Sequence, residues 1–253
     1  MTRIFTHPFV LFAFSLAALL LSVQVGSFLA SRLQPVKEEE RQDLDLVVSA
    51  SLTLLALIIG FSFSLAVSRY DQRKNYEEEE ANAIGTEYIR ADLLPAAEAA
   101  RLRQLLPQYL DRRLLFYTSR DPRQLEIVDK ETAQLQAELW STVQSVAAAA
   151  PNPVVALVVS GMNDVLNWQG YTQAAWWNRI PAGAWSLMAA LAGCCCILIG
   201  YSAHQRGAVL FTVVPVLVSI AFFLIADIDS PRRGIIRVAP QNLMSLSQSL
   251  HAQ

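Results

Sequence analysis

Four long stretches without a charged residue constrain the fold of this chain more than any other feature. They are residues 9–30, 46–67, 180–203 and 207–226, and each has at least 20 residues. A helix rises about 1.5 Å per residue, so a stretch of this length crosses a hydrocarbon layer roughly 30 Å thick. Only 17% of the chain is charged, whereas an ordinary soluble domain has roughly 25%. We therefore predict four transmembrane helices in a lipid bilayer.

The first of these stretches could be mistaken for a cleaved signal peptide. It is longer than the roughly 7–15 apolar residues of a signal core. Phe28 also interrupts the small-x-small pattern that a cleavage site ending at Ala30 would need. We expect a retained first helix.

The segment between the second and third spans, residues 68–179, holds most of the charge and has a helical pattern. We expect one helix over 70–94 that continues out of the second span and ends at Pro95. A second helix is expected over 96–117, bent or interrupted at Pro107 because proline removes a helical hydrogen bond. The apolar stretch 147–168 is broken by residues 151–153 (Pro-Asn-Pro), and Asn163 and Asp164 follow Met162. The span that remains is too short to cross a bilayer, so it predicts a partly buried helix instead.

A further long helix is predicted after Asp121, an N-cap followed by Pro122 at the first helical position, with Gln124 as a capping-box partner. Its apolar face would consist of Leu125, Val128, Thr132, Leu135, Leu139, Val143 and Val146, at three- and four-residue steps. The helix should end before Pro151. No alternating pattern of useful length predicts a strand.

The sequence thus predicts an all-α membrane protein with four transmembrane helices and a helical cytoplasmic domain inserted between the second and third. The expected parts are the first two spans (1–67), the helical domain (68–179), a transmembrane hairpin with its turn at 204–206 (180–226), and a tail (227–253). Eight lysines and arginines flank the spans on the side of the N-terminus, and four flank them on the other side. By the positive-inside rule, both termini lie in the cytoplasm and the protein resides in the inner (cell) membrane.

No motif points to an enzyme. The histidines have no second histidine or carboxylate at metal-ligand spacing, and there is no phosphate-binding glycine loop or nucleophile elbow. The only cysteines, 194–196, are neighbours on a helix and point in different directions, so we interpret them as apolar fillers. We predict no catalytic residue, no cofactor, no metal site and no nucleic-acid partner.

The second span differs from the others in its small and polar residues. A narrow stripe of them recurs at three- and four-residue steps: Ser49, Thr53, Ala56, Gly60, Ser64 and Ser68. Small residues let membrane helices pack closely, so helix packing is one explanation. The alternative is a helix that lines a water path, with Leu57 and Phe61 as an apolar constriction that gates by dewetting.

Four consecutive acids, Glu77 to Glu80, follow this span. A helix distributes them around most of its circumference, so a solvated or interfacial face explains them. The alternative is a vestibule that attracts cations, because rings of carboxylates select cations when several subunits surround one axis.

Three segments carry a resemblance to a known family. They are GFSFSLAVSRY (60–70), RYDQRKNYEEEEANAIGTEYIRADLLP (69–95) and DIDSPRRGIIRV (227–238). These segments resemble the signature blocks of the bacterial bestrophin-like family, which has four spans. The chain is more distantly similar to the bestrophins, which are anion channels.

The resemblance implies a homopentamer around a central pore that the second helix lines. The match at Gly60 and Phe61 puts Phe61 at the neck, with Leu57 and Thr53 at successive four-residue steps above it and Ser64 one turn from Gly60. Leu57 and Thr53 stand where bestrophins have aromatic residues. The cytoplasmic vestibule would contain Arg69, Arg73, Lys74, Glu77 and Glu80. The family analogy favours small anions such as chloride, and so do the three basic residues nearer the pore mouth, whereas the acids would favour cations.

The end of the fourth span departs from the bestrophin pattern. Bestrophins have an acidic run there that binds calcium, but here SPRRG leaves only Asp227 and Asp229. Carboxylates at a helix C-terminus are repelled by the helix dipole and need compensation. We interpret the segment as a charged hinge in which Arg232, Arg233 and Arg237 compensate the acids, or in which Arg69 or Arg73 pairs with them. We expect no calcium site.

Two classes of function therefore remain. The first is an oligomeric ion channel. The second is a membrane-anchored interaction or regulatory protein that acts through its helical domain, which makes up over two-fifths of the chain.

Overall fold

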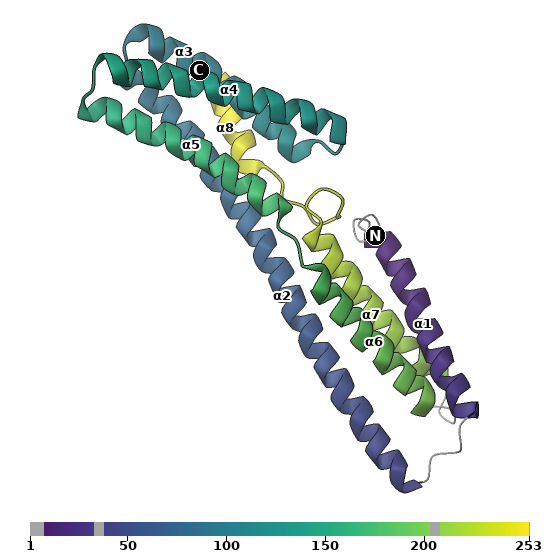
Figure 1. Cartoon of the computed structure of the whole chain (residues 1–253). Coiled ribbons are helices and arrows are strands. Elements are labelled where there is room, and N and C mark those ends of the chain that lie inside the picture. The colour runs from purple at the N-terminus through teal and green to yellow at the C-terminus, as the bar shows by residue number, and fades with distance from the viewer. Residues whose placement is uncertain (1–7, 33–37, 203–207, 253) are drawn as a thin grey trace. The chain divides into compact units, whose positions relative to one another are not determined.

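The computed structural model describes the backbone of residues 8–32, 38–202 and 208–252. It describes side chains for residues 8–32, 42–202 and 211–252. Its elements are α1 (Pro8–Arg32), α2 (Glu38–Arg90), the 3-10 helix η2 (Ala91–Leu93), α3 (Ala96–Thr118), α4 (Pro122–Ala149), α5 (Pro153–Trp177), α6 (Ala182–Ser202), α7 (Ala208–Asp229) and α8 (Gln241–His251) (Figure 1). No strand occurs among these described residues, so the all-α prediction is confirmed.

Four helical segments are long and apolar enough to cross a membrane. They lie in Pro8–Arg32, Gln42–Leu93, Pro153–Ser202 and Phe211–Asp229. The first two contain predicted stretches whole and the last two overlap theirs, so the prediction of a multi-pass membrane protein is confirmed. The turn expected at 204–206 lies outside the described residues.

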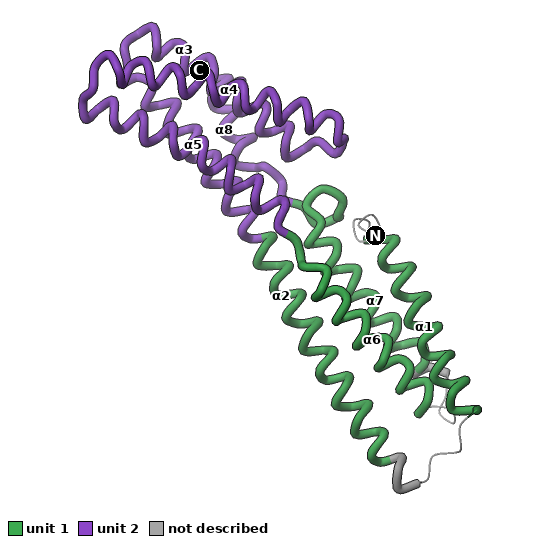
Figure 2. The backbone as a smooth tube through the Cα atoms, viewed as in Figure 1, with its two compact units in different colours: residues 1–70, 179–237 green, residues 71–178, 238–253 purple. Residues whose placement is uncertain are grey.

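The chain forms two compact units (Figure 2). Unit 1 consists of residues 1–70 and 179–237, and unit 2 consists of 71–178 and 238–253. The single 53-residue helix α2 contributes its first part to unit 1 and its last part to unit 2. The predicted tail is divided as well, because residues up to 237 belong to unit 1 and α8 belongs to unit 2.

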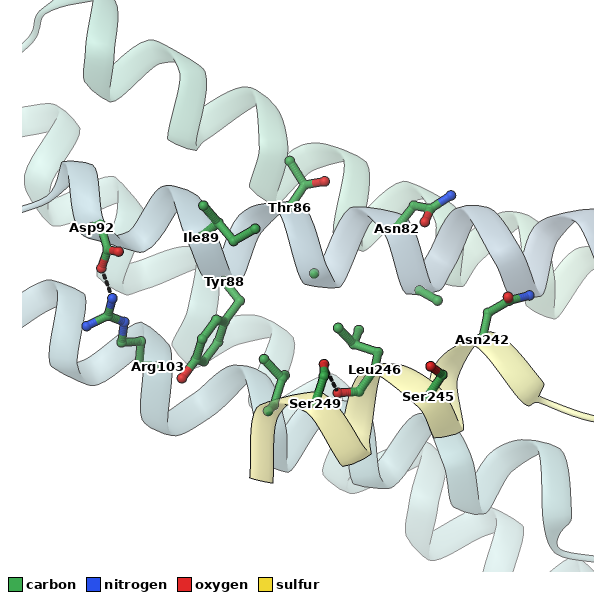
Figure 3. A pocket seen from close by; sticks show the side chains of 13 residues that line it. Asn82, Thr86, Tyr88, Ile89, Asp92, Arg103, Asn242, Ser245, Leu246 and Ser249 are labelled. Carbon is green, nitrogen blue, oxygen red and sulfur yellow. Dashed lines mark hydrogen bonds and ion pairs between the residues drawn. The ribbon is translucent and has the colours of Figure 1, made fainter. Parts of the chain in front are cut away.

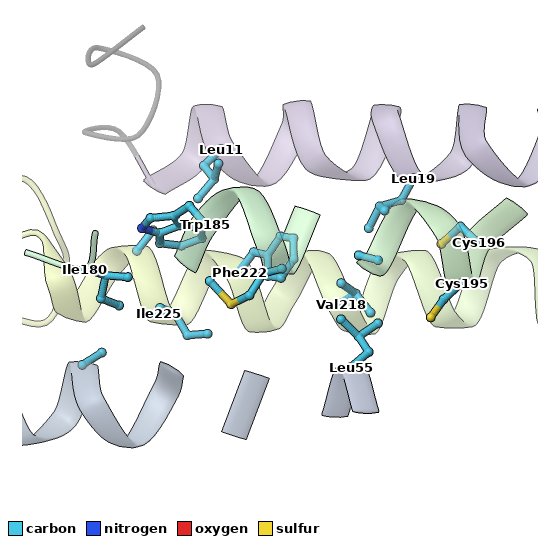
Figure 4. Packing of buried hydrophobic residues seen from close by; sticks show 14 of the residues in the cluster. Leu11, Leu19, Leu55, Ile180, Trp185, Cys195, Cys196, Val218, Phe222 and Ile225 are labelled. Atoms are coloured by element: carbon cyan, nitrogen blue, oxygen red, sulfur yellow. The ribbon is translucent and has the colours of Figure 1, made fainter. Parts of the chain in front are cut away.

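Unit 1 is held together by apolar packing among its helices. The core includes Leu19, Met188, Cys196 and Phe222, from α1, α6 and α7 (Figure 4). Two of the three adjacent cysteines are buried in it, in line with their interpretation as fillers. Their thiols need no metal to explain their position.

Glycines permit the closest approach in unit 1. A Cβ added at Gly26 of α1 would overlap the carbonyl oxygen of Ile197, and one at Gly200 of α6 would overlap that of Val23. Each glycine thus contacts the backbone of the other helix. Small residues at such crossings are typical of membrane helices, whose association depends on close packing because lipid tails are as apolar as leucine.

The helix boundaries in unit 2 follow from local chemistry. The Asp121 carboxylate accepts a hydrogen bond from the Arg123 backbone N–H (3.0 Å), as predicted for an N-cap. The predicted capping-box partner is wrong: the Gln124 amide oxygen accepts instead from the Ser119 hydroxyl (2.8 Å). Asn152 caps α5 in the same way as Asp121 caps α4, ahead of Pro153.

The helices themselves largely match the predictions. α2 and η2 reach Leu93, just before Pro95, and α3 continues through Pro107 without interruption. The predicted apolar face of α4 is the inward one, with Val128, Thr132, Leu139, Val143 and Val146 buried. The core of unit 2 also contains an aromatic group, in which the Trp176 ring lies 4.9 Å from Phe116 and 5.4 Å from Tyr117.

Candidate functional site

The apolar part of α2 has two opposite faces. Leu55, Ser62 and Ala66 are buried in unit 1. With 3.6 residues per turn, the opposite side carries the stripe predicted from the sequence. It also carries Leu57 and Phe61, the apolar constriction predicted beside the stripe. Thr53, Leu57, Gly60, Phe61 and Ser64 are all exposed in the single chain, and Phe61 is the most exposed apolar side chain among them at 68%.

This exposure bears on the two explanations of the stripe, which are close helix packing and a helix that lines a water path. Within one chain, the stripe does not pack against another helix at Gly60. A Cβ at Gly60 would have no heavy atom within 4 Å. Gly60 therefore does not mediate a close contact in unit 1, in contrast to Gly26 and Gly200. The stripe is available to water, to lipid or to another copy of the chain.

A groove of about 470 Å³ lies between α2 and α7. Its walls are apolar and include Phe63 from α2, two positions of the stripe, Ala56 and Gly60, and Leu217 and Ala221 from α7. One edge of the stripe thus borders an apolar groove.

The foot of the spans in unit 1 is organised around Asp229, at the end of α7. Its carboxylate oxygens accept hydrogen bonds from the Ile180 backbone N–H (3.2 and 3.1 Å) and lie 3.6 Å from Arg69 Nη1. Of the pairings that the sequence left open, Asp229 thus has the one with Arg69. Its contact with the Ile180 backbone was missed, because nothing in the sequence marks an N–H group 49 residues away.

Asp227 holds the turn that follows α7. Its two oxygens accept from the backbone N–H groups of Ile235 (2.7 Å) and Ile236 (2.8 Å). The chain can turn back this sharply because Gly234 has no side chain: a Cβ there would overlap the Asp227 carbonyl oxygen. SPRRG is therefore a compact turn, with Arg232 half-buried and Arg233 exposed on it.

The predicted vestibule residues have different positions within unit 2. Lys74 is exposed, whereas Arg73, Glu77 and Glu80 are at most 1% exposed. The Glu80 carboxylate accepts from Arg113, from the Tyr117 hydroxyl (3.2 Å) and from the Thr172 hydroxyl (3.2 Å). Burial lowers the pKa of the Arg113 guanidinium, but the adjacent Glu80 carboxylate raises it and the net shift is upward, so Arg113 stays charged in the core.

Glu77 anchors the last helix of the chain. Its carboxylate accepts from the Leu243 backbone N–H (2.9 Å) and from the Asn242 amide (2.7 Å), in the first turn of α8. No side chain of α8 itself caps that turn. Figure 3 shows α8 beside α2 across a groove of about 520 Å³, with the Arg103–Asp92 ion pair at one end.

This use of Glu77 and Glu80 differs from the vestibule role that the sequence suggested. A run of four acids places two on each side of a helix, and here Glu78 and Glu79 are the exposed ones. The sequence contained no signal for the partners of the buried two, which lie on α3, α5 and α8.

Comparison with known proteins now identifies the family. A family model described as the bestrophin-like domain matches residues 10–243. The chain belongs to the bestrophin-like family. No curated protein sequence matches it.

Solved structures share the bestrophin-like fold. A single-substitution variant of the bacterial bestrophin homolog from Klebsiella pneumoniae superposes with a TM-score of 0.64 at 16% identity, over 94% of this chain and 98% of that one. A second structure of that homolog gives a TM-score of 0.62 at 17% identity, over 92% and 94%. At such low identity the likeness shows the fold alone, and it extends over both units.

A calcium ion does not fit the hinge of this bestrophin-like protein. Calcium takes about 6–8 oxygen ligands. The oxygens of Asp227 and Asp229 already accept backbone N–H groups, and the Arg69 guanidinium lies beside Asp229. The hydrogen bonds and the ion pair of these two carboxylates suit a structural turn, and we derive no role for a metal there.

Proposed function

We propose that this protein is an oligomeric membrane channel that passes small ions, anions such as chloride in preference, through a pore lined by α2. The observation that supports this proposal most is the exposure of Thr53, Leu57, Gly60, Phe61 and Ser64 on one side of α2, opposite its buried face. The Thr53 hydroxyl donates to the Ser49 carbonyl oxygen of its own helix (2.9 Å). A water-filled path would satisfy the remaining hydrogen-bonding capacity of such hydroxyl groups.

One helix cannot enclose water, so the proposal requires several copies of the chain around an axis. Closed cyclic symmetry gives each copy the same environment. The resemblance to bestrophins favours a homopentamer. Its neck would be formed by Phe61, with Leu57 and Thr53 in successive rings above it.

The preference for anions rests on the resemblance to bestrophins, because the charges near the inner end of α2 do not favour one sign. Glu77 and Glu80 are engaged inside unit 2, which removes two of the four acids that would attract cations. Lys74 is exposed, but so are Glu78 and Glu79. The orientation that we propose has both termini and unit 2 in the cytoplasm, with the chain in the inner membrane.

Phe61→Ala tests the neck. If Phe61 narrows an apolar constriction, its loss admits water, and efflux of chloride from liposomes should rise at least tenfold, with a smaller rise for potassium. Phe63→Ala is the matched control, because it removes the same side chain from the flank that faces the α7 groove rather than from the stripe. Chloride and potassium efflux from liposomes of each variant, with assembly checked by size-exclusion chromatography, provides the measurement.

The outcomes separate the two functions. Increased efflux with Phe61→Ala alone supports the channel, whereas equal efflux for both variants excludes Phe61 as a constriction. A monodisperse monomer in mild detergent would contradict the oligomer. Assembled wild type and Phe61→Ala that pass neither ion would favour a membrane-anchored interaction protein acting through unit 2.

A further inference from the structure

Glu87 is a buried acid that neither the fold nor the proposed pore explains. It lies in the part of α2 that belongs to unit 2, well beyond the apolar run that ends at Val67. Its side chain is 0% exposed, and neither carboxylate oxygen has a hydrogen-bond partner. A buried carboxylate in this state is unfavourable when ionised, since water and donors are both missing.

The groups around Glu87 come from α2 and α5. A Cβ on Gly161 of α5 would overlap both Glu87 Oε2 and Arg90 Nη1, so both side-chain ends occupy the space that this glycine leaves. Arg90 Nη1 nevertheless donates to the Leu157 carbonyl oxygen, over a long 3.4 Å. Asp164 of α5 is the other charged group that faces Glu87, and it is exposed.

A cavity of about 220 Å³ lies beside the neighbours of Glu87 and is lined by Arg90, Gly161, Asp164 and Glu79 among others. Glu87 does not line it, and the side chain of Arg90 and the helix of Gly161 separate the carboxylate from this space. A volume of this size holds several water molecules, each of which needs about 30 Å³ in the liquid.

We propose that Glu87 is a proton-binding site whose occupancy selects one of two packings of α2 against α5. With the proton bound, the neutral carboxyl is tolerated without a partner, and Arg90 donates to the Leu157 carbonyl oxygen. When the proton leaves to the cavity water, the Glu87 carboxylate draws the Arg90 guanidinium away from Leu157, and an ion pair replaces the contact to α5. The joint between the two helices in unit 2 then loosens.

The direction of the effect follows from the environment of the acid. Burial raises the pKa of Glu87 to about 8, with Arg90 lowering it and Asp164 raising it. Roughly nine in ten of these carboxyls are then protonated at pH 7. Because the folded-state pKa lies above the ordinary value of 4.5, the native chain binds a proton that the unfolded chain does not. The stabilising contribution is complete below pH 4.5 and is lost as pH rises through about 8.

This site would also regulate the pore, and that half of the inference rests on the proposed function. α2 is one uninterrupted helix from Glu38 to Arg90, so the residues proposed to line the pore and the proton site belong to the same helix. Ion efflux should therefore change at least twofold between pH 7 and pH 9.

The test compares the full-length protein with Glu87→Gln, whose amide has the shape of the protonated carboxyl and cannot ionise. The melting temperature of the wild type in detergent should fall as pH rises from 7 to 9, and that of Glu87→Gln should fall much less. Glu79→Gln is the matched control, because it removes an exposed acid of the same helix that lines the same cavity; its pH profile should follow the wild type. Infrared difference spectra should show loss of a protonated carboxyl band near pH 8 that is missing in Glu87→Gln.

Two further variants test the direction in which the pH of the transition should move. Arg90→Gln removes the group that lowers the pKa of Glu87, so its transition should move to higher pH. Asp164→Asn removes the group that raises it, so its transition should move slightly lower, since Asp164 is exposed and screened. Identical pH profiles for wild type and Glu87→Gln, or no carboxyl band in the wild type, would overturn the proton site.

Efflux measurements decide the regulatory half. A pH-dependent efflux in the wild type that disappears in Glu87→Gln supports it, and the same efflux profile in both overturns it. If no variant conducts at any pH, the proposed channel function fails, while the melting and infrared results still decide whether Glu87 binds a proton.

Discussion

Unit 1 is packed around leucine, methionine, cysteine and phenylalanine side chains, whereas unit 2 places Arg113 and Glu80 in the middle of its helices. The helices of unit 1 approach through Gly26 and Gly200, backbone against backbone. Those of unit 2 meet through large side chains such as Tyr109, Phe116 and Trp176.

The difference teaches that the two units rely on different forces. Between helices in lipid there is no hydrophobic driving force, so van der Waals contact at close range must hold them. Unit 2 buries apolar surface from water, which contributes roughly 25 cal/mol per Å². That gain can offset the desolvation of an ion pair, provided that both partners stay in place.

Removing one partner of the buried pair should have the largest effect. Arg113→Met leaves the Glu80 carboxylate buried with only two hydroxyl donors, and breaking a buried pair costs about 3–5 kcal/mol. Chemical denaturation of unit 2 followed by tryptophan fluorescence should show this loss.

Arg112→Met is the control for Arg113→Met. Arg112 also pairs with a glutamate, Glu131 at 2.8 Å, but both side chains are more than a third exposed. Pairs of this kind contribute at most about 1 kcal/mol. Equal losses in the two variants would show that burial is not what distinguishes unit 2. The double variant Glu80→Gln with Arg113→Met should regain part of the stability, because neither member of the pair is then left as a buried charge.

Adding one methyl group to the glycine contact of unit 1 should have the next largest effect. The Cβ of Gly200→Ala overlaps the Val23 carbonyl oxygen, which belongs to a helix backbone and cannot move aside. Overpacking of this kind costs about 1–3 kcal/mol. The thermal stability of the protein in mild detergent measures it.

Gly183→Ala makes the same change in the same helix, at a position with no neighbour within 4 Å. It should leave the melting temperature unchanged or raise it slightly, since alanine favours helix more than glycine. A loss as large as that of Gly200→Ala would mean that α6 is sensitive to alanine as such, and the contrast between the units would lose its basis.

The sequence predicted these features unequally, and the reason is the range of the interactions. The four spans, the Asp121 cap and the buried face of α4 depend on the spacing of residues within one segment, so the sequence predicts them directly. Glu80 pairs with Arg113, which lies 33 positions further on, and Glu77 contacts α8 across more than 160 positions. Four acids in a row are equally compatible with a solvated face and with two buried anchors, because the sequence does not show which helices will cover α2.

The smallest effect should come from Glu77, which gives unit 2 a hydrogen-bonded attachment rather than a core pair. Glu77→Ala removes the acceptor for the Leu243 N–H and the Asn242 amide, and loss of a helix cap costs about 1 kcal/mol. Hydrogen exchange at the Leu243 amide should accelerate roughly fivefold, with the rest of unit 2 unchanged. Glu78→Ala, one position along and exposed, should leave that amide as protected as in the wild type.

Burial raises the pKa of Glu77 more than the bonds from α8 lower it, so the docked state binds a proton more readily than a free glutamate does. Its stabilising effect is therefore kept below pH 4.5 and declines as pH rises through the raised pKa. Acid alone should not release α8, and faster exchange of Leu243 at pH 5 than expected from the intrinsic rate would contradict this assignment of Glu77.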